Sequence, residues 1–302
     1  MLALSTAWYK REDPTIGSTL KAIAAMGFGA VEIGIGKARF DVGQVQKTLK
    51  SVPLKVVSVH NVCSKRSPGP ENERGDWLAS PDPKQRREAV ALTLESVENA
   101  RAMGCGVVVL HLGIIPIEQR WEKQDLLYKL GEGGPPAAVE YGVTIQDVLD
   151  ERYALVAPYF DAACQSLAEL LQPTSGVKFG LECRMGWHEL PSLDEVGKLL
   201  QRFPDPRVGY WHDTGHAVLQ EAMGIAGQLD WLRRYGHRTF GIHLHDVTER
   251  VRDHYPPGLG TVDFKPLLGL LPPGALRVME IASRFLPEEI AVGRKRLEEM
   301  GW

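Results

Sequence analysis

Short runs of apolar, largely β-branched residues alternate along this chain with longer stretches of helical periodicity. Eight such runs occur in 302 residues, about 38 residues for each run and its helix. Most are continuously apolar, as in parallel strands buried on both faces. The alternation therefore predicts an α/β protein with a parallel sheet. The expected strands are Leu2–Thr6, Ala30–Ile35, Lys55–Val62, Gly106–Leu112, Lys178–Cys183, Val208–His212, Thr239–Leu244 and Arg277–Ile281.

Several helix ends are marked in the sequence. Asp82-Pro83 is typical of a helix start, with an N-capping aspartate and proline at the first helical position. Ser192 and Glu195 have the spacing of a capping box. Amphipathic stretches also end at Met-Gly pairs, where glycine suits a left-handed cap, and two of these pairs lead directly into a strand. The pairs are at 26–27, 103–104 and 300–301.

Eight strand–helix units predict a single (β/α)8 TIM-barrel domain over residues 1–302. The main alternative is an open doubly wound sheet, which usually has a glycine-rich phosphate loop after its first strand. Here the residues after that strand are Ser5-Thr-Ala-Trp-Tyr9, which favours the barrel. We expect long loops at about 64–81 and 114–142, forming either a substrate wall or lid, an oligomer contact or surface decoration.

Composition limits the class of function. The chain has 35 Lys and Arg against 38 Asp and Glu, a net charge of −3 that offers no general attraction to nucleic acid. No run approaches the roughly 18 apolar residues of a membrane span, and the amino terminus lacks signal-peptide features. Four widely spaced cysteines argue against a disulfide framework or zinc ribbon. We expect a cytoplasmic protein with neither nucleic acid nor a membrane as partner.

Six of the expected strands end at or near a residue that can bind a metal. Because a barrel gathers the carboxyl ends of its strands at one mouth, these side chains should converge. Carboxylate and imidazole together suit a divalent metal such as Mn²⁺, Co²⁺, Zn²⁺ or Mg²⁺. Any one of them alone is more often a hydrogen-bonded structural residue than a ligand, but six at corresponding positions favour a metal site. The six are His60, His111, Glu182, Asp213, His243 and Glu280.

Further polar residues follow the later strands. In Asp213-Thr-Gly-His216 both end residues can reach one site as the strand turns, the alternative being a tight turn capped by the aspartate. Arg250, Asp253 and His254 precede a glycine-containing loop, where they either meet a sugar hydroxyl, carboxylate or phosphate or belong to a solvated loop. Three other histidines are expected to be structural or at the surface: His188, His212 and His237.

Five features of this chain resemble those of the xylose isomerase-like TIM-barrel superfamily: Glu182, the Asp213–His216 turn, His243-Leu-His-Asp246, the loop Pro257–Phe264 and Glu280. That group contains sugar and sugar-phosphate isomerases and epimerases, inosose dehydratases and the endonuclease IV type of AP endonuclease. The resemblance covers essentially the whole chain. It implies one divalent metal bound by Glu182, Asp213, His243 and Glu280, with both glutamates as acid and base and His216 on the substrate.

The reaction implied is a proton transfer on a ketose, an inosose or a similar polyol. A metal polarises the carbonyl and acidifies the neighbouring C–H. Glu182 and Glu280 would then remove and return a proton through an enediolate, and His216 would donate to the oxyanion. Dehydration of a keto-polyol or keto-acid on the same site stays open. Candidates for the substrate wall, with barrel packing or a rim position as the alternative, are Trp8, Glu32, Arg184 and Trp187, with Arg250 as a further substrate contact.

Endonuclease IV resembles this chain at every metal-ligand position and is the alternative function. His60, His111, His254 and Asp253 would then complete sites for up to three Zn²⁺ used in phosphodiester hydrolysis. The loop after His60 does not resemble the DNA-inserting loop of that family, and the net charge gives no phosphate attraction, so sugar chemistry is favoured. Many sugar-directed members have lysine where this chain has His245, so that substrate contact is not expected. A homo-oligomer is compatible with the sequence.

Overall fold

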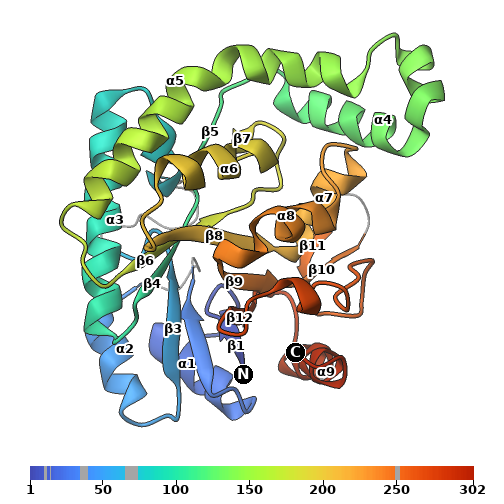
Figure 1. Ribbon diagram of the computed structural model, residues 1–302. Helices are drawn as coiled ribbons and strands as arrows, with labels where there is room; N and C mark the ends of the chain where they lie inside the picture. Colours follow the sequence, from blue (N-terminus) through green and yellow to red (C-terminus); the bar gives the residue numbers. More distant parts are fainter. Residues whose placement is uncertain (10–11, 14, 35–39, 65–73, 249–251) are drawn as a thin grey trace.

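The computed structural model describes residues 1–302 except 10–11, 14, 35–39, 65–73 and 249–251. In this part of the chain, eight parallel strands close into a barrel in the order β1-β12-β9-β8-β6-β4-β3-β2 (Figure 1). The expected α/β class and TIM barrel are confirmed. The barrel strands are β1 Leu2–Ser5, β2 Ala30–Ile33, β3 Lys55–His60, β4 Val107–Leu110, β6 Lys178–Glu182, β8 Val208–Asp213, β9 Thr239–Leu244 and β12 Leu276–Met279.

All eight expected strands are present, with ends within two residues of those inferred from the sequence. Among the described residues, two short antiparallel pairs lie outside the barrel. They are β5 Gly113–Ile114 with β7 Glu189–Leu190, and β10 Asp246–Thr248 with β11 Arg252–Tyr255.

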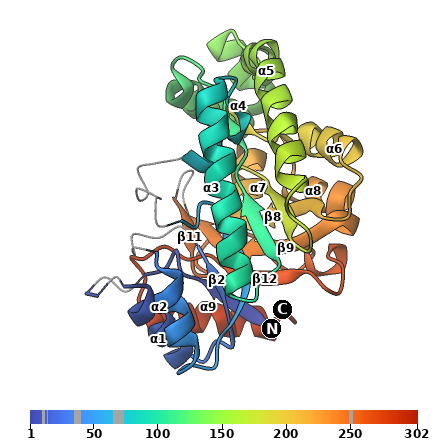
Figure 2. The same ribbon diagram turned by 90° about the vertical axis from the view of Figure 1, so that its left-hand side faces the viewer.

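Helices surround the strands, as two perpendicular views show (Figures 1 and 2). The inferred helix starts are confirmed: Asp82 accepts the N–H of Lys84 at 2.7 Å, and Ser192 and Glu195 form a capping box. Gly27, Gly104 and Gly301, the three expected caps, all have positive φ. The helices are α1 Ile16–Ala25, α2 Val42–Leu49, α3 Pro83–Ala102, α4 Arg120–Tyr141, α5 Ile145–Leu171, α6 Leu193–Arg202, α7 Thr214–Ala222, α8 Gln228–Tyr235 and α9 Pro287–Glu299; 3-10 turns lie at Arg74–Ala79, Gly236–Arg238 and Leu268–Leu270.

The expectation of a long loop at 114–142 is wrong, because most of this segment is helix α4. Its glycine- and proline-rich stretch is a break at Gly134 (φ 57°) within a helical region. Leu127 and Leu130 form an apolar face of this helix and are buried. With α5 it covers one end of the molecule (Figure 1). Of the other expected loop, 64–81, residues 65–73 lie outside the described part, and 74–79 form a 3-10 turn.

A tryptophan fills the barrel interior beneath the carboxyl ends of the strands. Trp211 on β8 is fully buried, and its ring is 5.1 Å from that of His243 between centroids. A Cβ at Gly241 would lie 2.4 Å from the indole, so only glycine leaves room for it on the neighbouring strand. Trp211 therefore packs in the barrel interior directly beneath His243.

None of the described helices combines the length and apolarity needed to cross a bilayer. All four cysteines are buried free thiols. A cavity of about 580 Å³ opens at the amino ends of the strands beside Lys55 and Lys178, away from the strand-end residues discussed next.

Candidate metal centre

Four neighbouring strands each present one metal-binding side chain at the barrel mouth. In barrel order, β6, β8, β9 and β12 carry Glu182, Asp213, His243 and, just past its strand, Glu280. One ligand atom from each lies within 4.8 Å of the others, and all four residues are buried. The set expected from the sequence is therefore brought together, with the two glutamates on the outer strands of the four.

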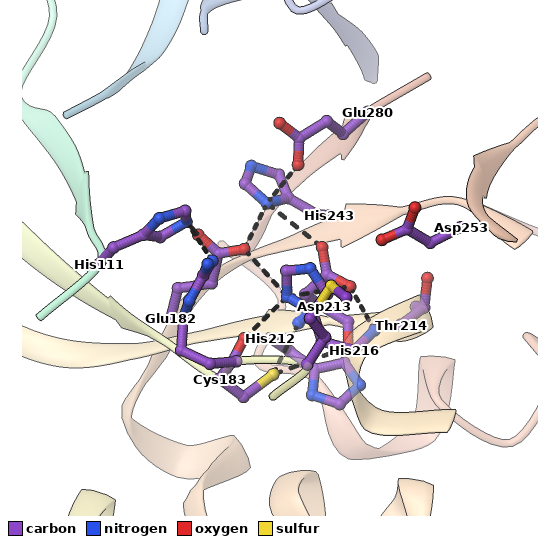
Figure 3. A network of polar contacts seen from close by, with 12 residues as sticks. His111, Glu182, Cys183, His212, Asp213, Thr214, His216, His243, Asp253 and Glu280 are labelled. Carbon is purple, nitrogen blue, oxygen red and sulfur yellow. Dashed lines mark hydrogen bonds and ion pairs between the residues drawn. The ribbon is translucent and has the colours of Figure 1, made fainter. Parts of the chain in front are cut away.

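His243 is the centre of this group (Figure 3). Its Nδ1 lies 3.1 Å from Oε2 of Glu280, 3.3 Å from Oε1 of Glu182 and 3.6 Å from Oδ2 of Asp213. On the other side of the ring, Nε2 lies 3.1 Å from Oε1 of Glu32. Three carboxylate oxygens around one ring nitrogen require a proton or a cation among them, because all four atoms are otherwise acceptors.

The group carries an excess of negative charge. Burial alone would raise the pKa of Glu182, but nearby His111 and His243 outweigh it and hold the pKa well below its usual range. The surrounding histidines likewise outweigh burial and lower the pKa values of Asp213 and Glu280. Burial lowers the pKa of His243. The nearby carboxylates, Glu280 first, outweigh this effect and raise the pKa well above its usual value. Three ionised carboxylates with one imidazole fit a divalent cation.

A second group shares Glu182. His60 and His111 place Nε2 3.1 Å and 3.0 Å from Oε2 of Glu182, whose other oxygen faces His243. Nδ1 of His60 donates to the carbonyl of Asn61 at 2.9 Å, since a carbonyl only accepts. Nε2 of a neutral His60 thus has no proton and turns a lone pair toward the carboxylate. A cation beside Oε2 of Glu182 is therefore favoured on this side of the carboxylate as well.

The guanidinium of Arg184 supplies positive charge at that face. One of its terminal nitrogens contacts Nε2 of His111, the ring nitrogen that also faces Oε2 of Glu182. The remaining nitrogens pair with Glu189, at 3.0 Å from Nε and 2.8 Å from Nη2 to Oε1. Arg184, expected from the sequence at the substrate wall, therefore lies directly beside the metal centre.

His216 follows Asp213 on the first turn of α7. Its N–H donates to Oδ1 of Asp213 at 2.7 Å, so the Asp-Thr-Gly-His turn is both a helix cap and part of the site. Nδ1 donates to the carbonyl of Cys183 at 2.9 Å. Burial lowers the pKa of His216, so the ring is neutral and Nε2 is an acceptor. In this tautomer Nε2 of His216 accepts a hydrogen bond, and its donation to a substrate oxyanion stays a prediction.

A third group stands on the other side of Asp213. Ligand atoms of His216, His245 and His254 lie within 4.8 Å of one another. Nδ1 of His254 is 3.0 Å from Oδ1 of Asp253, and the imidazoles of His254 and His245 stack with centroids 4.2 Å apart. Both residues predicted as additional ligands on β11 thus lie near the main group.

The glycine-containing loop after β11 is held by one carboxylate. Asp246 accepts four backbone N–H groups at 2.8–3.0 Å, from Val247 and from Gly258, Gly260 and Val262. A Cβ at Gly260 would meet the carbonyl of Val247 at 2.1 Å, which accounts for that glycine. Asp246 therefore shapes the rim of the mouth and is not itself among the metal-binding residues.

The other expected substrate contacts differ in their placement. Trp8 and Trp187 are buried and donate their indole N–H groups to the carbonyls of Phe285 and Arg120 at 2.9 Å and 3.2 Å. Barrel packing accounts for both, and their contact with substrate stays a prediction. Arg250 lies outside the described residues.

The histidines set aside from the sequence are placed as expected. Side chains alternate along a strand, so His212 on β8 points away from the mouth, and its Nδ1 lies 2.8 Å from the hydroxyl of Tyr210. Burial lowers the pKa of His212 to about 3 and that of His188 to about 4. His237 is exposed.

Two residues of the centre were not recognised from the sequence as part of it. Glu32, expected at the substrate wall, is fully buried and bonded to His243 and to Ser58. Its position at the end of the second strand follows the same rule as the other six and was the available signal. His245 is the second, since only its departure from the family pattern was noted.

The comparisons with known proteins agree with this architecture. The family model described as xylose isomerase-like TIM barrel matches residues 20–275. No curated protein matches the sequence.

Among solved structures, a D-tagatose 3-epimerase-like protein superposes with a TM-score of 0.69 at 17% identity, over 99% of this chain and 96% of its own. The 3-keto-D-glucoside 4-epimerase from E. coli gives 0.67 at 16% identity, over 99% and 98%. D-psicose 3-epimerase from Clostridium cellulolyticum H10, solved with D-tagatose, gives 0.64 at 12% identity, over 99% and 98%. At identities this low the likeness establishes the fold alone.

Proposed function

Since the chain belongs to the xylose isomerase-like TIM barrel family, we propose that it is a divalent-metal-dependent isomerase or epimerase of a sugar or sugar-like polyol, such as a ketose or inosose. One observation carries the proposal: Glu182 and Glu280 stand on the outer two of four neighbouring strands, with Asp213 and His243 between them. Mn²⁺, Co²⁺, Zn²⁺ and Mg²⁺ all suit this donor set.

Two glutamates on the outer strands of the four suit a proton transfer at a substrate carbon bound between them. The metal, when bound, polarises the substrate carbonyl and so acidifies the adjacent C–H. One glutamate then removes that proton and the other returns it to the enediolate, on the opposite face for epimerisation. Both glutamates lie at the mouth and both are ionised in the free protein, so either fits the base. The one that returns the proton must first take one up from solvent.

The neighbouring side chains supply positions for substrate hydroxyls. Nε2 of His216 is an acceptor and the guanidinium of Arg184 is a donor. Together they can accept from one substrate hydroxyl and donate to another. Arg184 also borders a cavity of about 210 Å³ with Arg120 and Trp121. Through Arg184, which also contacts His111, this cavity gives room for the part of the substrate that does not react.

Deuterium exchange tests the proposal whichever product the protein forms. Metal-loaded protein is incubated in D₂O with a panel of ketoses and inososes, and NMR follows the proton on the carbon next to the carbonyl. We expect exchange with at least one substrate, and exchange slowed by at least about 10²-fold in the Glu182→Gln and Glu280→Gln variants. A dehydratase would instead give a product that has lost water. Absence of exchange and of elimination across the panel would contradict the proposal.

A multi-zinc AP endonuclease is the second candidate, favoured by the two further groups of possible ligands around His60 and His254. The contact between Arg184 and His111 weighs against it, because the guanidinium competes with a metal for the same nitrogen. Incubation of the zinc-loaded protein with a duplex carrying one abasic site separates the two candidates. We expect no cleavage, and robust cleavage would favour the nuclease.

A further inference from the structure

We propose that His245 is a positioning residue that orients Asp213 for metal binding, and this inference rests on the proposed function. His245 lies between His243 and Asp246, and its side chain is fully buried. Its imidazole is in direct contact with one of the four ligands of the centre, Asp213.

The hydrogen bonds of His245 fix the position of its ring proton. Nδ1 accepts the backbone N–H of His254 at 2.9 Å, and a backbone amide is always a donor. The proton of the neutral ring is therefore on Nε2. A second contact of Nδ1, with the carbonyl oxygen of Asp246 at 3.5 Å, is too long to compete.

Nε2 of His245 points at Asp213. It lies 2.9 Å from Oδ1 and 3.0 Å from Oδ2, so the N–H donates to the carboxylate. Oδ1 also accepts the backbone N–H of His216 at 2.7 Å. With two donors on Oδ1, the carboxylate has a fixed plane, and Oδ2 is directed toward Nδ1 of His243 at 3.6 Å.

The fold reserves space for this imidazole. A Cβ on Gly215 would lie 2.1 Å from Cε1 and 2.6 Å from Nδ1 of His245, so the glycine of the Asp-Thr-Gly-His turn is required by the ring beside it. Thr214 holds the backbone of His245 from both sides. Its hydroxyl donates to the carbonyl of His245 at 2.7 Å and accepts the N–H at 3.1 Å.

The same contacts distinguish a positioning role from ligation. Metal binding through Nδ1 would displace the N–H of His254, and binding through Nε2 would remove the donor from Asp213. His245 is thus occupied at both nitrogens, unlike His216, of which only Nδ1 has a carbonyl to donate to. An oriented carboxylate loses less freedom on binding a metal, which is the effect expected of a hydrogen-bonding partner behind a ligand.

Two amide variants separate the two hydrogen bonds of the ring. In His245→Gln the side-chain amide reaches the place of Nε2 and still donates to Asp213. In His245→Asn the shorter amide reaches only the place of Nδ1 and still accepts from His254. We titrate each metal-free protein with Mn²⁺ by calorimetry, record the unfolding temperature of the metal-free form and follow amide exchange at His254.

We expect His245→Asn to weaken Mn²⁺ binding by about 10- to 100-fold while amide protection at His254 is kept. His245→Gln should bind Mn²⁺ within about threefold of the wild type and lose protection at His254. Wild-type affinity in His245→Asn would overturn the inference. So would equal losses of affinity in both variants that track a lower unfolding temperature, since a purely structural role predicts that pattern.

The titration also separates this inference from the proposed function. If the wild type binds no Mn²⁺, both fail. If it binds Mn²⁺ and the two variants differ as expected, but no ketose or inosose exchanges deuterium, the positioning role stands and the proposed reaction is wrong.

Discussion

Nε2 of His243 lies 3.1 Å from Oε1 and 3.2 Å from Oε2 of Glu32, so the ring nitrogen remote from the metal centre faces a buried carboxylate. The hydroxyl of Ser58 donates to that carboxylate at 2.7 Å and fixes it. A carboxylate in this position holds the proton on Nε2 and leaves the lone pair of Nδ1 for a metal. Glu32 on β2 thus orients His243, and His245 beside β9 orients Asp213.

Removal of the Glu32 carboxylate should weaken metal binding. We expect Glu32→Ala to lower the affinity for Mn²⁺ by about 10- to 100-fold, because the tautomer and orientation of His243 are no longer fixed. Glu32→Gln, which keeps an oxygen that can accept from Nε2, should lose less. Calorimetric titration of the metal-free proteins measures both. An alanine variant within twofold of the wild type would refute this role.

Each glutamate of the centre should be essential for proton transfer. Glu182→Gln and Glu280→Gln should each slow deuterium exchange by at least about 10²- to 10⁴-fold, the usual contribution of an acid or base. Unfolding temperatures of the metal-free proteins serve as the control for folding. Full activity of either variant would remove that residue from the acid–base pair.

Loss of the Arg184 guanidinium should change the number of metals bound. Arg184→Ala removes the guanidinium from Nε2 of His111, so we expect the group of His60, His111 and Glu182 to take a second Zn²⁺. Arg120→Ala is the matched control, because Arg120 lines the same cavity but belongs to none of the metal-binding groups. Elemental mass spectrometry on zinc-loaded protein should show one metal in the control and two in Arg184→Ala. One metal in both would contradict the competition.

Buried neutral histidines should make the protein less stable as the pH falls. Burial lowers the pKa of His212 to about 3, against about 6.5 in an unfolded chain. Between these values the unfolded chain holds a proton that the folded protein does not, so the free energy of unfolding falls with pH. His212→Asn should reduce this slope by about 1.4 kcal/mol per pH unit between pH 6 and 4.

Urea unfolding of the metal-free protein at several pH values measures that slope. His237→Asn, at an exposed position, is the control and should leave it unchanged. An unaltered slope in His212→Asn would show that this histidine already binds a proton in the folded state.

The sequence was most informative about the strands and their ends. Parallel strands buried on both faces are continuous apolar runs, and a barrel collects whatever follows them, so Glu182, Asp213, His243 and Glu280 could be predicted as one site. Helix α4 could not be predicted, because Gly134 and the prolines after it are typical of loops. The helix forms there because one of its faces is buried against the rest of the protein.

The supporting residues were harder to infer for a different reason. Glu32 and His245 act through other side chains, and their roles depend on which ring nitrogen faces which oxygen. That orientation is a property of three-dimensional packing, set for His245 by the absence of a side chain at Gly215. The identity of the substrate and the self-association of the chain stay predictions, because neither is determined by the apolar runs of the strands or by the residues that follow them.

The number of metal ions bound per chain tests the central claim most directly. Elemental mass spectrometry on protein purified without chelator should find about one divalent metal per chain, and Asp213→Asn should lose most of it. Two or three zinc ions per chain would contradict the one-metal centre and favour the nuclease. No metal, even after reloading, would show that the strand-end carboxylates and histidines serve another purpose.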